Sequence, residues 1–408
     1  MSKDNRRFKH ILAPQMLPIH FRLFEQIMKN EGYNLVILDE STPTMIEEGL
    51  KYVHNDTCYP ALVVIGQIIE AFKSGKYDPK ETAVTLTQTG GGCRASNYLK
   101  LLRKALDKAG YGDVTVLSIN MSGYEKDSSI PLNFSMIRKL LAGVVYGDLI
   151  MHIANQVRPY EINKGETDKL IDEFVDTLSQ QLIHKKGLSK HGIKKNSAKI
   201  VQRFAQIKKE EKKLVKVGVV GEIFVKYSKV GNNNLEELLH NEGAEVRVPG
   251  LMGFLNHCIS QKFDQQELYG GQKKLALGAR ILYKYTTSLE KIMNKQIKKH
   301  SSFDEIMPFD EVRHIAKEVC GLGIIMGEGW LLTAEMLALC MEGFENIVCT
   351  QPFGCLPNHI IGKGMVRRIK ELHEGANIVS IDYDPSATKV NQENRIKLML
   401  SVAKEKLK

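Results

Sequence analysis

Three cysteines lie in short turns whose surroundings indicate chemistry. Cys93 follows a β-branched run in TQTGGGCRASNY, and Cys355 does the same in QPFGCLPNH. Each turn places its cysteine where a helix is expected to begin, and Cys58 in NDTCYP has a similar setting. The first N–H groups of a helix are unpaired and the helix dipole favours negative charge, so a thiol there is biased toward thiolate. Thiolates bind metals or attack substrates, and three of them indicate one shared site.

The glycines beside these cysteines favour an iron–sulfur cluster. A cluster needs thiolate ligands, and hydrogen bonds to its sulfurs tune its potential. Gly92 and Gly354 precede Cys93 and Cys355. Because glycine has no Cβ, these turns are expected to bring backbone N–H groups close to a cluster. Three thiolate ligands would leave one iron open to substrate, whereas a fourth would close the site for electron transfer alone.

Other uses of cysteine fit the sequence less well. The chain has seven cysteines but no CxxC pair, which argues against finger-type zinc sites and thioredoxin motifs. His359 follows Cys355 at a spacing that zinc ligands use, but Cys58 and Cys93 have no such neighbour. A nucleophilic enzyme needs only one activated thiolate. The segment TGGGCRAS lacks the GK[ST] of a phosphate-binding loop, so we expect no ATP site in this chain.

The remaining cysteines are expected to be structural. Cys340 lies in a helix-like apolar run, Cys349 lies in a strand-like run, and Cys258 follows a helix. Cys320 precedes the strand-like run GLGIIMG. A core position is expected for it, and a role as fourth ligand stays open.

Several polar residues are expected to face the same site. Glu222 in VVGEIF and Glu328 in MGEGW both follow strand-like runs, and a carboxylate there can relay a proton. Capping a helix is the structural alternative for each. Arg94 and Asn97 lie in the first turn after Cys93, where they can donate hydrogen bonds to a cluster or a thioester carbonyl.

Two further sequence features predict purely structural contacts. In RPYE, Arg158 and Glu161 are expected to form an ion pair. Asp384, which precedes Pro385, is expected to cap a helix.

The bulk composition is that of a soluble protein with more than one domain. The chain has 408 residues, is 43% hydrophobic and 25% charged, and carries a net charge of +10. Much of that charge lies in residues 184–216, which are expected to form a solvated helical face without aromatic interleaving. No apolar run approaches the roughly 20 residues of a membrane span. We therefore expect a cytoplasmic protein that binds neither nucleic acid nor membrane.

The order of the predicted elements indicates two α/β halves. Strand-like and helix-like segments alternate in residues 1–134 and again in 213–408, and residues 135–212 read as a helical region between them. The predicted fold class is α/β, with two flavodoxin- or Rossmann-like parallel sheets. Ligands of such sheets bind outside the carboxyl ends of the strands. A cleft between the two halves would therefore bring Cys93 and Cys355 together.

These segments resemble the 2-hydroxyacyl-CoA dehydratase family, whose relatives include the double-cubane iron–sulfur reductases. The resemblance is closest to the dehydratase-like portion of large proteins described as CoA-dehydratase activase-related, and it covers most of the chain. It runs through NDTCYPA, TQTGGGCRASNY, RPYE, VGVVGEIFVKY, MGEGWLLTAEM, QPFGCLPNHIIGKG and IDYDPSATKVNQENRIKLML.

The resemblance implies a [4Fe–4S] cluster bound by Cys58, Cys93 and Cys355 between two flavodoxin-like domains. In the dehydratases, an ATPase activator with its own cluster injects one electron. That electron reduces the thioester carbonyl to a ketyl radical, which expels the hydroxyl, while the open iron binds the substrate oxygen as a Lewis acid. The resemblance therefore implies an acyl-CoA substrate, an activator partner and a homo- or heterodimer. A double-cubane reductase of small molecules stays open, as does a non-catalytic electron-transfer or scaffold subunit.

Overall fold

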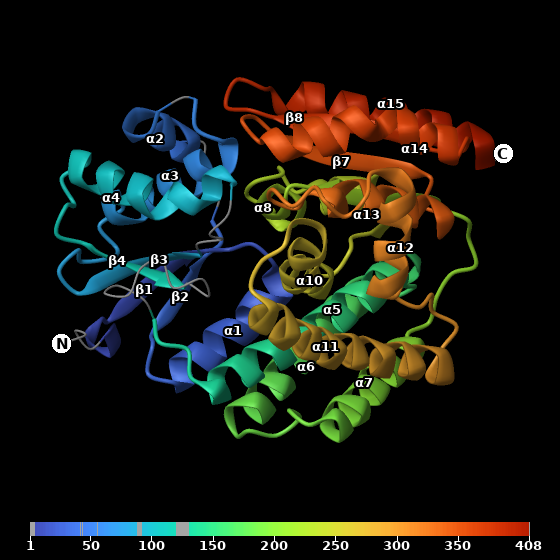
Figure 1. Ribbon diagram of the computed structural model, residues 1–408, viewed down its shortest axis with the longest axis horizontal. Coiled ribbons are helices and arrows are strands. Elements are labelled where there is room, and N and C mark those ends of the chain that lie inside the picture. The colour runs from blue at the N-terminus through green and yellow to red at the C-terminus, as the bar shows by residue number, and fades with distance from the viewer. Residues whose placement is uncertain are drawn as a thin grey trace.

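The computed structural model describes residues 5–40, 42, 44–54, 56–87, 92–119 and 130–407. It contains two four-stranded parallel sheets, with strand orders β2-β1-β3-β4 and β6-β5-β7-β8 (Figure 1). In both sheets the second strand along the chain lies outside the first, and the third and fourth continue on the other side. This is the order of flavodoxin-like sheets. The predicted α/β class is therefore confirmed.

The first sheet and its helices form from the N-terminal part of the chain. Its elements are β1 (His10–Pro14), α1 (Pro18–Asn30), β2 (Leu35–Leu38), α2 (Thr44–Tyr52), α3 (Tyr59–Lys73), β3 (Thr82–Thr87), the 3-10 turn η2 (Arg94–Asn97), α4 (Tyr98–Lys108) and β4 (Thr115–Ile119). The strands are almost continuously buried, as in β1 and β3, because helices cover both faces of a parallel sheet. The helix expected from about residue 95 begins at Tyr98, after the 3-10 turn.

The helical region consists of α5 (Phe134–Val157), η3 (Arg158–Tyr160), α6 (Glu166–Ile183) and α7 (Lys190–Ala205). The segment Phe134–Tyr160 is long and apolar enough to cross a membrane, but 89% of its most apolar window is buried within the protein. This burial is typical of a core helix in a soluble protein.

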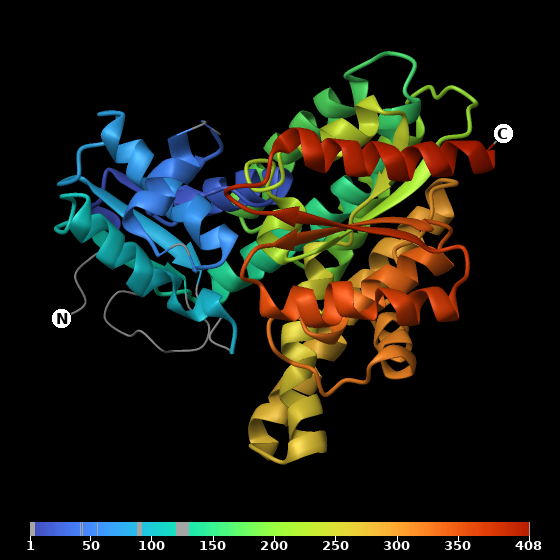
Figure 2. The same cartoon turned by 90° about the horizontal axis from the view of Figure 1, so that it is seen from above.

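The second sheet belongs to the rest of the chain. Its elements are β5 (Val215–Gly221), α8 (Ile223–Tyr227), α9 (Leu235–Asn241), β6 (Ala244–Arg247), α10 (Leu251–Tyr269), α11 (Lys273–His300), α12 (Phe309–Val319), α13 (Trp330–Met341), β7 (Asn346–Pro352), η4 (Asn358–Gly362), η5 (Lys363–Met365), α14 (Val366–Leu372), β8 (Asn377–Tyr383) and α15 (Lys389–Leu407). Helices α10 and α11 form a hairpin that extends away from the rest of the protein (yellow in Figure 2).

The segment GLGIIMG corrects one prediction, because it forms a loop and not a strand. Gly321, Gly327 and Gly329 have φ values of +75°, +60° and +49°, which lie outside the strand conformation. The backbone N–H of Trp330 donates to the carbonyl of Ile324 and thereby closes the loop into a turn. Glu328 therefore follows a loop and precedes α13.

Three smaller predictions are also wrong. Arg158 pairs with Asp168 at 2.8 Å, while the Glu161 carboxylate accepts hydrogen bonds from the backbone N–H groups of residues 165 and 167. Cys258 lies inside α10 and not after it. Asp384 accepts from the backbone N–H of Ser386, so it caps a turn well before α15 begins.

Candidate functional site

The loops that carry the predicted cysteines meet between the two sheets. The backbone N–H of Tyr59 donates to the carbonyl of Phe353 at 3.0 Å. A Cβ added to Gly354 would lie 3.0 Å from the Cα of Cys58 and 3.1 Å from an Nη atom of Arg94. Gly354 also has a φ of +75°, so both its conformation and its space favour glycine. The loop after β7 thus lies directly against the loop before α3.

Each of the three cysteines immediately precedes a helix or a helical turn, as the sequence predicts. Cys58 is the N-cap residue of α3, and Cys93 is the N-cap residue of η2. The Sγ atom of Cys93 accepts from the backbone N–H of Ala95 at 3.5 Å. Cys355 comes directly before the helical turn that leads into η4. Unpaired N–H groups at these starts favour negative charge on the sulfurs.

The thiols and two carboxylates occupy one electrostatic neighbourhood. Burial raises the pKa of the Cys93 thiol to about 11, and the charges of Glu328, Glu222 and Cys58 raise it further. Burial also raises the pKa of the Cys355 thiol well above its usual range, with contributions from the same two carboxylates and from Cys93. The structure therefore brings together the three predicted ligands and the two predicted acids.

Tyr98 is a site residue that the sequence reasoning missed. Its hydroxyl lies 2.8 Å from the Sγ of Cys58. Burial raises the pKa of the Cys58 thiol, whereas this hydrogen bond and the nearby Arg94 guanidinium lower it. Tyr98 lies five residues after Cys93, at the start of α4. Its position close to Cys93 was the only feature of the sequence that could have marked Tyr98 as a site residue. The contact with Cys58 depends on how the loops fold together.

Glu222 and Glu328 form a carboxylate pair at the start of α8. The side chain of Glu222 caps α8 by accepting from the backbone N–H of Val225 at 2.9 Å. Glu328 accepts from the backbone N–H of Ile223 at 2.8 Å. Burial and the charge of Glu328 raise the pKa of Glu222 to about 8, and burial raises the pKa of Glu328. At least one carboxyl of this pair therefore keeps its proton near neutral pH.

A buried lysine lies between this pair and a partly open pocket. Lys226 Nζ lies 3.2 Å from Glu335, both side chains are buried, and the Lys226 charge lowers the pKa of Glu328. Glu335 lines a cavity of about 100 Å³. The charged or ionisable side chains around that cavity are Asp148, His152, Arg247, Glu290, Glu335 and Glu342. Space of this size can hold a few water molecules.

The other predicted site residues have more peripheral positions. Arg94 is exposed, and its guanidinium donates to the carbonyl of Asp56. Asn97 is exposed at the end of η2. Gly92 lies under Met326, since a Cβ there would be 1.9 Å from the Met326 sulfur. Residues 88–91, which complete that glycine turn, lie outside the described part of the chain.

The remaining cysteines divide into core and borderline positions. Cys340 and Cys349 are buried, as predicted. Burial raises the pKa of the Cys258 thiol to about 12, and the charge of Glu328 adds to this, so Cys258 lies closer to the site than its sequence context indicated. Burial raises the pKa of the Cys320 thiol, and a hydrogen bond with Thr333 lowers it. None of the three predicted ligands affects this pKa.

The donor chemistry at the site fits an iron–sulfur cluster. Thiolates are the ligands that such clusters require. Cys58 and Cys355 are buried and Cys93 is half-buried, each directly before a helix or helical turn, and the Arg94 guanidinium lies near Cys58. In the described part of the chain, no group of at least three His, Cys, Asp or Glu side chains is arranged to hold a metal ion. The raised thiol pKa values mean that the metal-free site holds mainly neutral thiols, and metal binding would release their protons.

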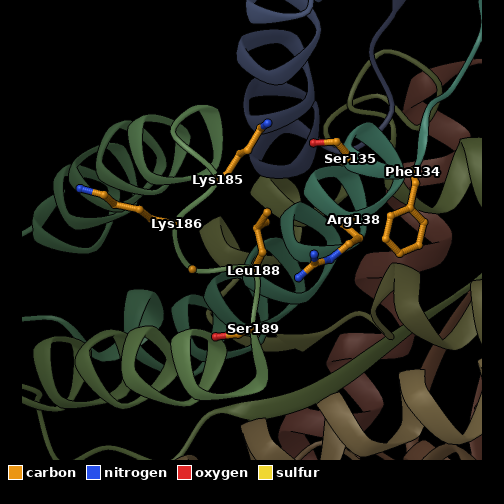
Figure 3. A pocket seen from close by; sticks show the side chains of 8 residues that line it. Phe134, Ser135, Arg138, Lys185, Lys186, Leu188 and Ser189 are labelled. Carbon is orange, nitrogen blue, oxygen red and sulfur yellow. The ribbon is translucent and has the colours of Figure 1, made fainter.

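An open hollow of about 550 Å³ lies elsewhere, between the start of α5 and the loop before α7 (Figure 3). Its cationic side chains are Arg138, Lys185 and Lys186, and the two lysines point in different directions. None of its lining residues is a predicted site residue. The hollow is therefore separate from the thiol site.

Comparison with known proteins adds no assignment for this site. No protein-family model matches the chain, and no curated protein matches it. A function is therefore inferred from the thiols, the carboxylates and the phenol described above.

Proposed function

We propose that this protein is the iron–sulfur component of an ATP-dependent low-potential system and acts as a 2-hydroxyacyl-CoA dehydratase does. The observation that carries the proposal is the convergence of Cys58, Cys93 and Cys355 between two parallel sheets. These residues are far apart in the sequence, so their meeting is a property of the fold. A thiol cluster beside a carboxylate pair fits a site where electrons and protons are both delivered.

Cys58, Cys93 and Cys355 would hold the cluster. When bound, a [4Fe–4S] cluster supplies one-electron reduction and, at an iron without a protein ligand, Lewis acidity toward a substrate oxygen. The phenol of Tyr98 lies 2.8 Å from the Cys58 sulfur and would donate a hydrogen bond to a thiolate there. The Arg94 guanidinium favours negative charge on the same sulfur. Gly354 allows the loop of Cys355 to approach the loop of Cys58 closely.

Glu328 and Glu222 would manage the protons. Loss of a hydroxyl group as water requires one proton at the departing oxygen, and a carboxyl that stays protonated near neutral pH can provide it. The raised pKa of Glu222, about 8, gives the pair that capacity. The Lys226 charge acts on both carboxyls, and its ion-pair partner Glu335 lines the nearby pocket.

The surroundings of the site also support a cytoplasmic protein with an energising partner. All seven cysteines are free, which is typical of a reducing compartment. By the resemblance to the 2-hydroxyacyl-CoA dehydratases, we assign ATP hydrolysis and electron donation to an activator partner. An acyl-CoA is the proposed substrate class on the basis of the resemblance to the 2-hydroxyacyl-CoA dehydratases.

The decisive experiment is to purify the full chain without oxygen and measure iron and sulfide per chain together with electron paramagnetic resonance. We expect about four irons for wild type and loss of the signal in Cys58→Ser, Cys93→Ser and Cys355→Ser. Cys340→Ser, which changes a buried cysteine in the core, is the matched control and should keep its iron.

Other results would redirect the assignment. About eight irons would indicate a double-cubane reductase. Loss of iron in Cys320→Ser would indicate a fourth ligand and favour an electron carrier. Absence of iron, or iron that is indifferent to the three predicted ligands, would overturn the cluster model. A cluster-loaded protein that fails to dehydrate acyl-CoA with an activator would leave the cluster intact and remove the dehydratase assignment.

A further inference from the structure

A partly open pocket of about 100 Å³ lies beside the carboxyl end of β6, and we call it the β6 pocket. It is the pocket that Glu335 lines, and its other walls come from α5, α10, α11, α12 and the loop at residues 248–250. Parallel sheets bind their ligands beyond the carboxyl ends of the strands. Space that can hold a few water molecules can equally hold one small organic molecule. The position and the size of the β6 pocket therefore suit a small ligand.

Glu290 on α11 leaves one carboxyl oxygen unpaired in the β6 pocket. The residue is only 5% exposed, and its Oε1 accepts from the backbone N–H of Phe309 at 2.8 Å. Among the described residues, no donor lies within hydrogen-bond distance of Oε2. This oxygen is also not one of the unpaired polar atoms that the protein seals off from solvent. Oε2 therefore faces open space, and the β6 pocket is the space that Glu290 lines.

His152 on α5 provides a second free acceptor in the same pocket. It is 7% exposed, and its Nε2 lies 2.7 Å from the backbone carbonyl of Asp304. A carbonyl oxygen only accepts, so Nε2 carries the proton and Nδ1 keeps its lone pair. Burial lowers the pKa of His152 to about 3, so the ring stays neutral at physiological pH. Like Oε2 of Glu290, Nδ1 has no partner among the described residues and is not sealed off from solvent.

The two acceptors lie in the same acidic part of the pocket. Asp148 and His152 are one turn apart on α5, so their side chains share a face of that helix. The charge of Asp148 also raises the pKa of Glu290, which places the carboxyl of Glu290 near that face. Among the described residues that line the pocket, the one cation is Arg247, which is already paired with Asp304 at 3.0 Å. The lining therefore has no free cation with which to bind an anion.

Much of the remaining lining is apolar and adaptable. Four of the 15 methionines of the chain line the pocket: Met151, Met252, Met293 and Met307. The flexible thioether side chain of methionine adapts to ligands of different shapes. A few free acceptors within a mostly apolar lining are typical of a site for a small organic molecule.

We propose that the β6 pocket binds a small organic ammonium compound, whose N–H groups donate to Glu290 Oε2 and His152 Nδ1 while its short apolar chain contacts the methionines. An ammonium group has several N–H donors and no acceptor, as two free acceptors require. Its charge would give Glu290 the ion-pair partner that this carboxyl lacks among the described residues. The apolar lining favours an organic cation over a hydrated metal ion. The inference does not depend on the proposed function.

Binding of an ammonium compound should release the proton of Glu290. Burial and the charges of Asp310 and Asp148 raise the pKa of this carboxyl to about 8, against the opposing charge of Lys291. The other ionisable side chains around the pocket are His152, Arg247, Glu335 and Glu342. A bound cation favours the ionised carboxyl. The affinity should therefore rise by about 10-fold or more from pH 6 to pH 8 in wild type, but not in Glu290→Gln.

NMR spectroscopy of the full chain with ¹³C-labelled methionine methyl groups tests the proposal. The probe is n-butylammonium, and the control ligand is 1-butanol, which has nearly the same shape without the charge. We expect saturable shifts of the Met252 and Met293 signals, which Met252→Leu and Met293→Leu identify. Met28, which packs in the core of the first sheet, should not shift. The affinity for n-butylammonium should exceed that for 1-butanol by at least about 10-fold.

A matched pair of variants tests the role of the carboxylate. Glu290→Gln removes the charge and keeps the shape, so the affinity for n-butylammonium should fall at least about 10-fold while that for 1-butanol stays the same. Glu173→Gln changes an exposed carboxyl on α6 and should bind as wild type does. An unchanged methyl spectrum of each free variant establishes that it folds. The proposal is overturned if n-butylammonium causes no saturable shift, if 1-butanol binds as tightly, or if Glu290→Gln keeps the wild-type affinity.

Discussion

At the scale of single residues, burial and proximity set the protonation of the site. Burial raises the pKa values of the Cys93 and Cys355 thiols, and nearby carboxylates raise them further. Tyr98 and Arg94, in contrast, lower the pKa of the Cys58 thiol. Burial still raises the pKa of Cys58, but Cys58 is the one of these three thiols whose pKa a side-chain hydrogen bond and a nearby guanidinium lower. Its environment differs from the other two although all three precede helices.

The hydrogen bond from Tyr98 can be tested in iron-free protein. Tyr98→Phe removes the hydroxyl that lowers the pKa of Cys58, so the thiolate fraction falls. Alkylation of Cys58 should become roughly 3- to 10-fold slower at a fixed pH. Mass spectrometry measures the rate, and Cys93 in the same molecule is the control. An unchanged or faster rate at Cys58 would contradict the role assigned to the phenol.

The carboxylate pair predicts a distinctive dependence of stability on pH. The folded-state pKa of Glu222 is about 8, above its unfolded value of roughly 4.3. The folded protein therefore retains a proton that the unfolded chain loses, and stability falls as pH rises between about 4.5 and 8. At pH 9 we therefore expect the free energy of unfolding of Glu222→Gln to exceed that of wild type by roughly 2 kcal/mol. This is less than the full pKa difference would give, because Glu222 is only half-buried and solvent screens its charge.

Urea denaturation at several pH values measures this gain. Glu173→Gln is the contrasting control, because Arg203 lowers the pKa of Glu173 and its removal should bring no gain at high pH. If the free energies of unfolding of Glu222→Gln and wild type change with pH in the same way from pH 5 to 9, the carboxyl does not hold a proton in the folded state.

At the scale of elements, the contact between α2 and α3 sets the position of Cys58. A Cβ on Gly66 would lie 1.9 Å from the carbonyl oxygen of Met45, and one on Gly49 would lie 2.2 Å from that of Leu62. The two helices thus cross with their backbones in contact. Because Cys58 is the N-cap of α3, this crossing fixes where its sulfur lies.

We expect Gly66→Ala to reduce the free energy of unfolding by roughly 1–3 kcal/mol, because the added methyl group forces α2 away from α3. Gly253→Ala, in α10, is the matched control, since a Cβ there meets no atom within 4 Å. It should be neutral or stabilising by up to about 1 kcal/mol. Equal unfolding midpoints in urea for the two variants would show that the crossing tolerates a Cβ.

At the scale of the whole molecule, Asp148 connects three helices that come from different parts of the chain. It lies on α5, accepts from the ring of His20 on α1 at 2.8 Å, and accepts from the backbone N–H groups of Leu251 and Met252 at the start of α10. A Cβ on Gly250 would lie 2.7 Å from its carboxyl carbon. This buried carboxylate therefore helps to hold the two sheets in the relation that brings the thiols together.

Asp148→Asn should lower the free energy of unfolding by roughly 2–4 kcal/mol, since an amide cannot accept all three hydrogen bonds. Thermal or urea denaturation measures the loss, and hydrogen exchange should accelerate at the first amides of α10. Asp172→Asn is the control, because Asp172 is 61% exposed in its pair with Arg22 and should cost less than about 1 kcal/mol. Similar losses in both variants would contradict a connecting role for Asp148.

The fold class and the local setting of the cysteines were predictable from the sequence alone. Both follow from neighbours in the chain: buried strands appear as apolar runs, and a helix start depends on the residues that flank it. The helix starts after Cys58, Cys93 and Cys355 were predictable for that reason, as was the capping role of Glu222. The loop at residues 321–329 was not predictable, because its isoleucines match a strand pattern while three of its four glycines adopt positive φ.

Which of these groups contact one another depends on the tertiary fold. The contact of Tyr98 with Cys58 spans 40 residues, and that of Glu328 with the start of α8 spans 105. The predicted ion pair of Arg158 with Glu161 was wrong because both residues have other partners in the folded protein. Arg158 pairs with Asp168, and Glu161 accepts hydrogen bonds from backbone N–H groups. Such partners depend on the relative placement of whole elements, and no local pattern of residue types records that placement.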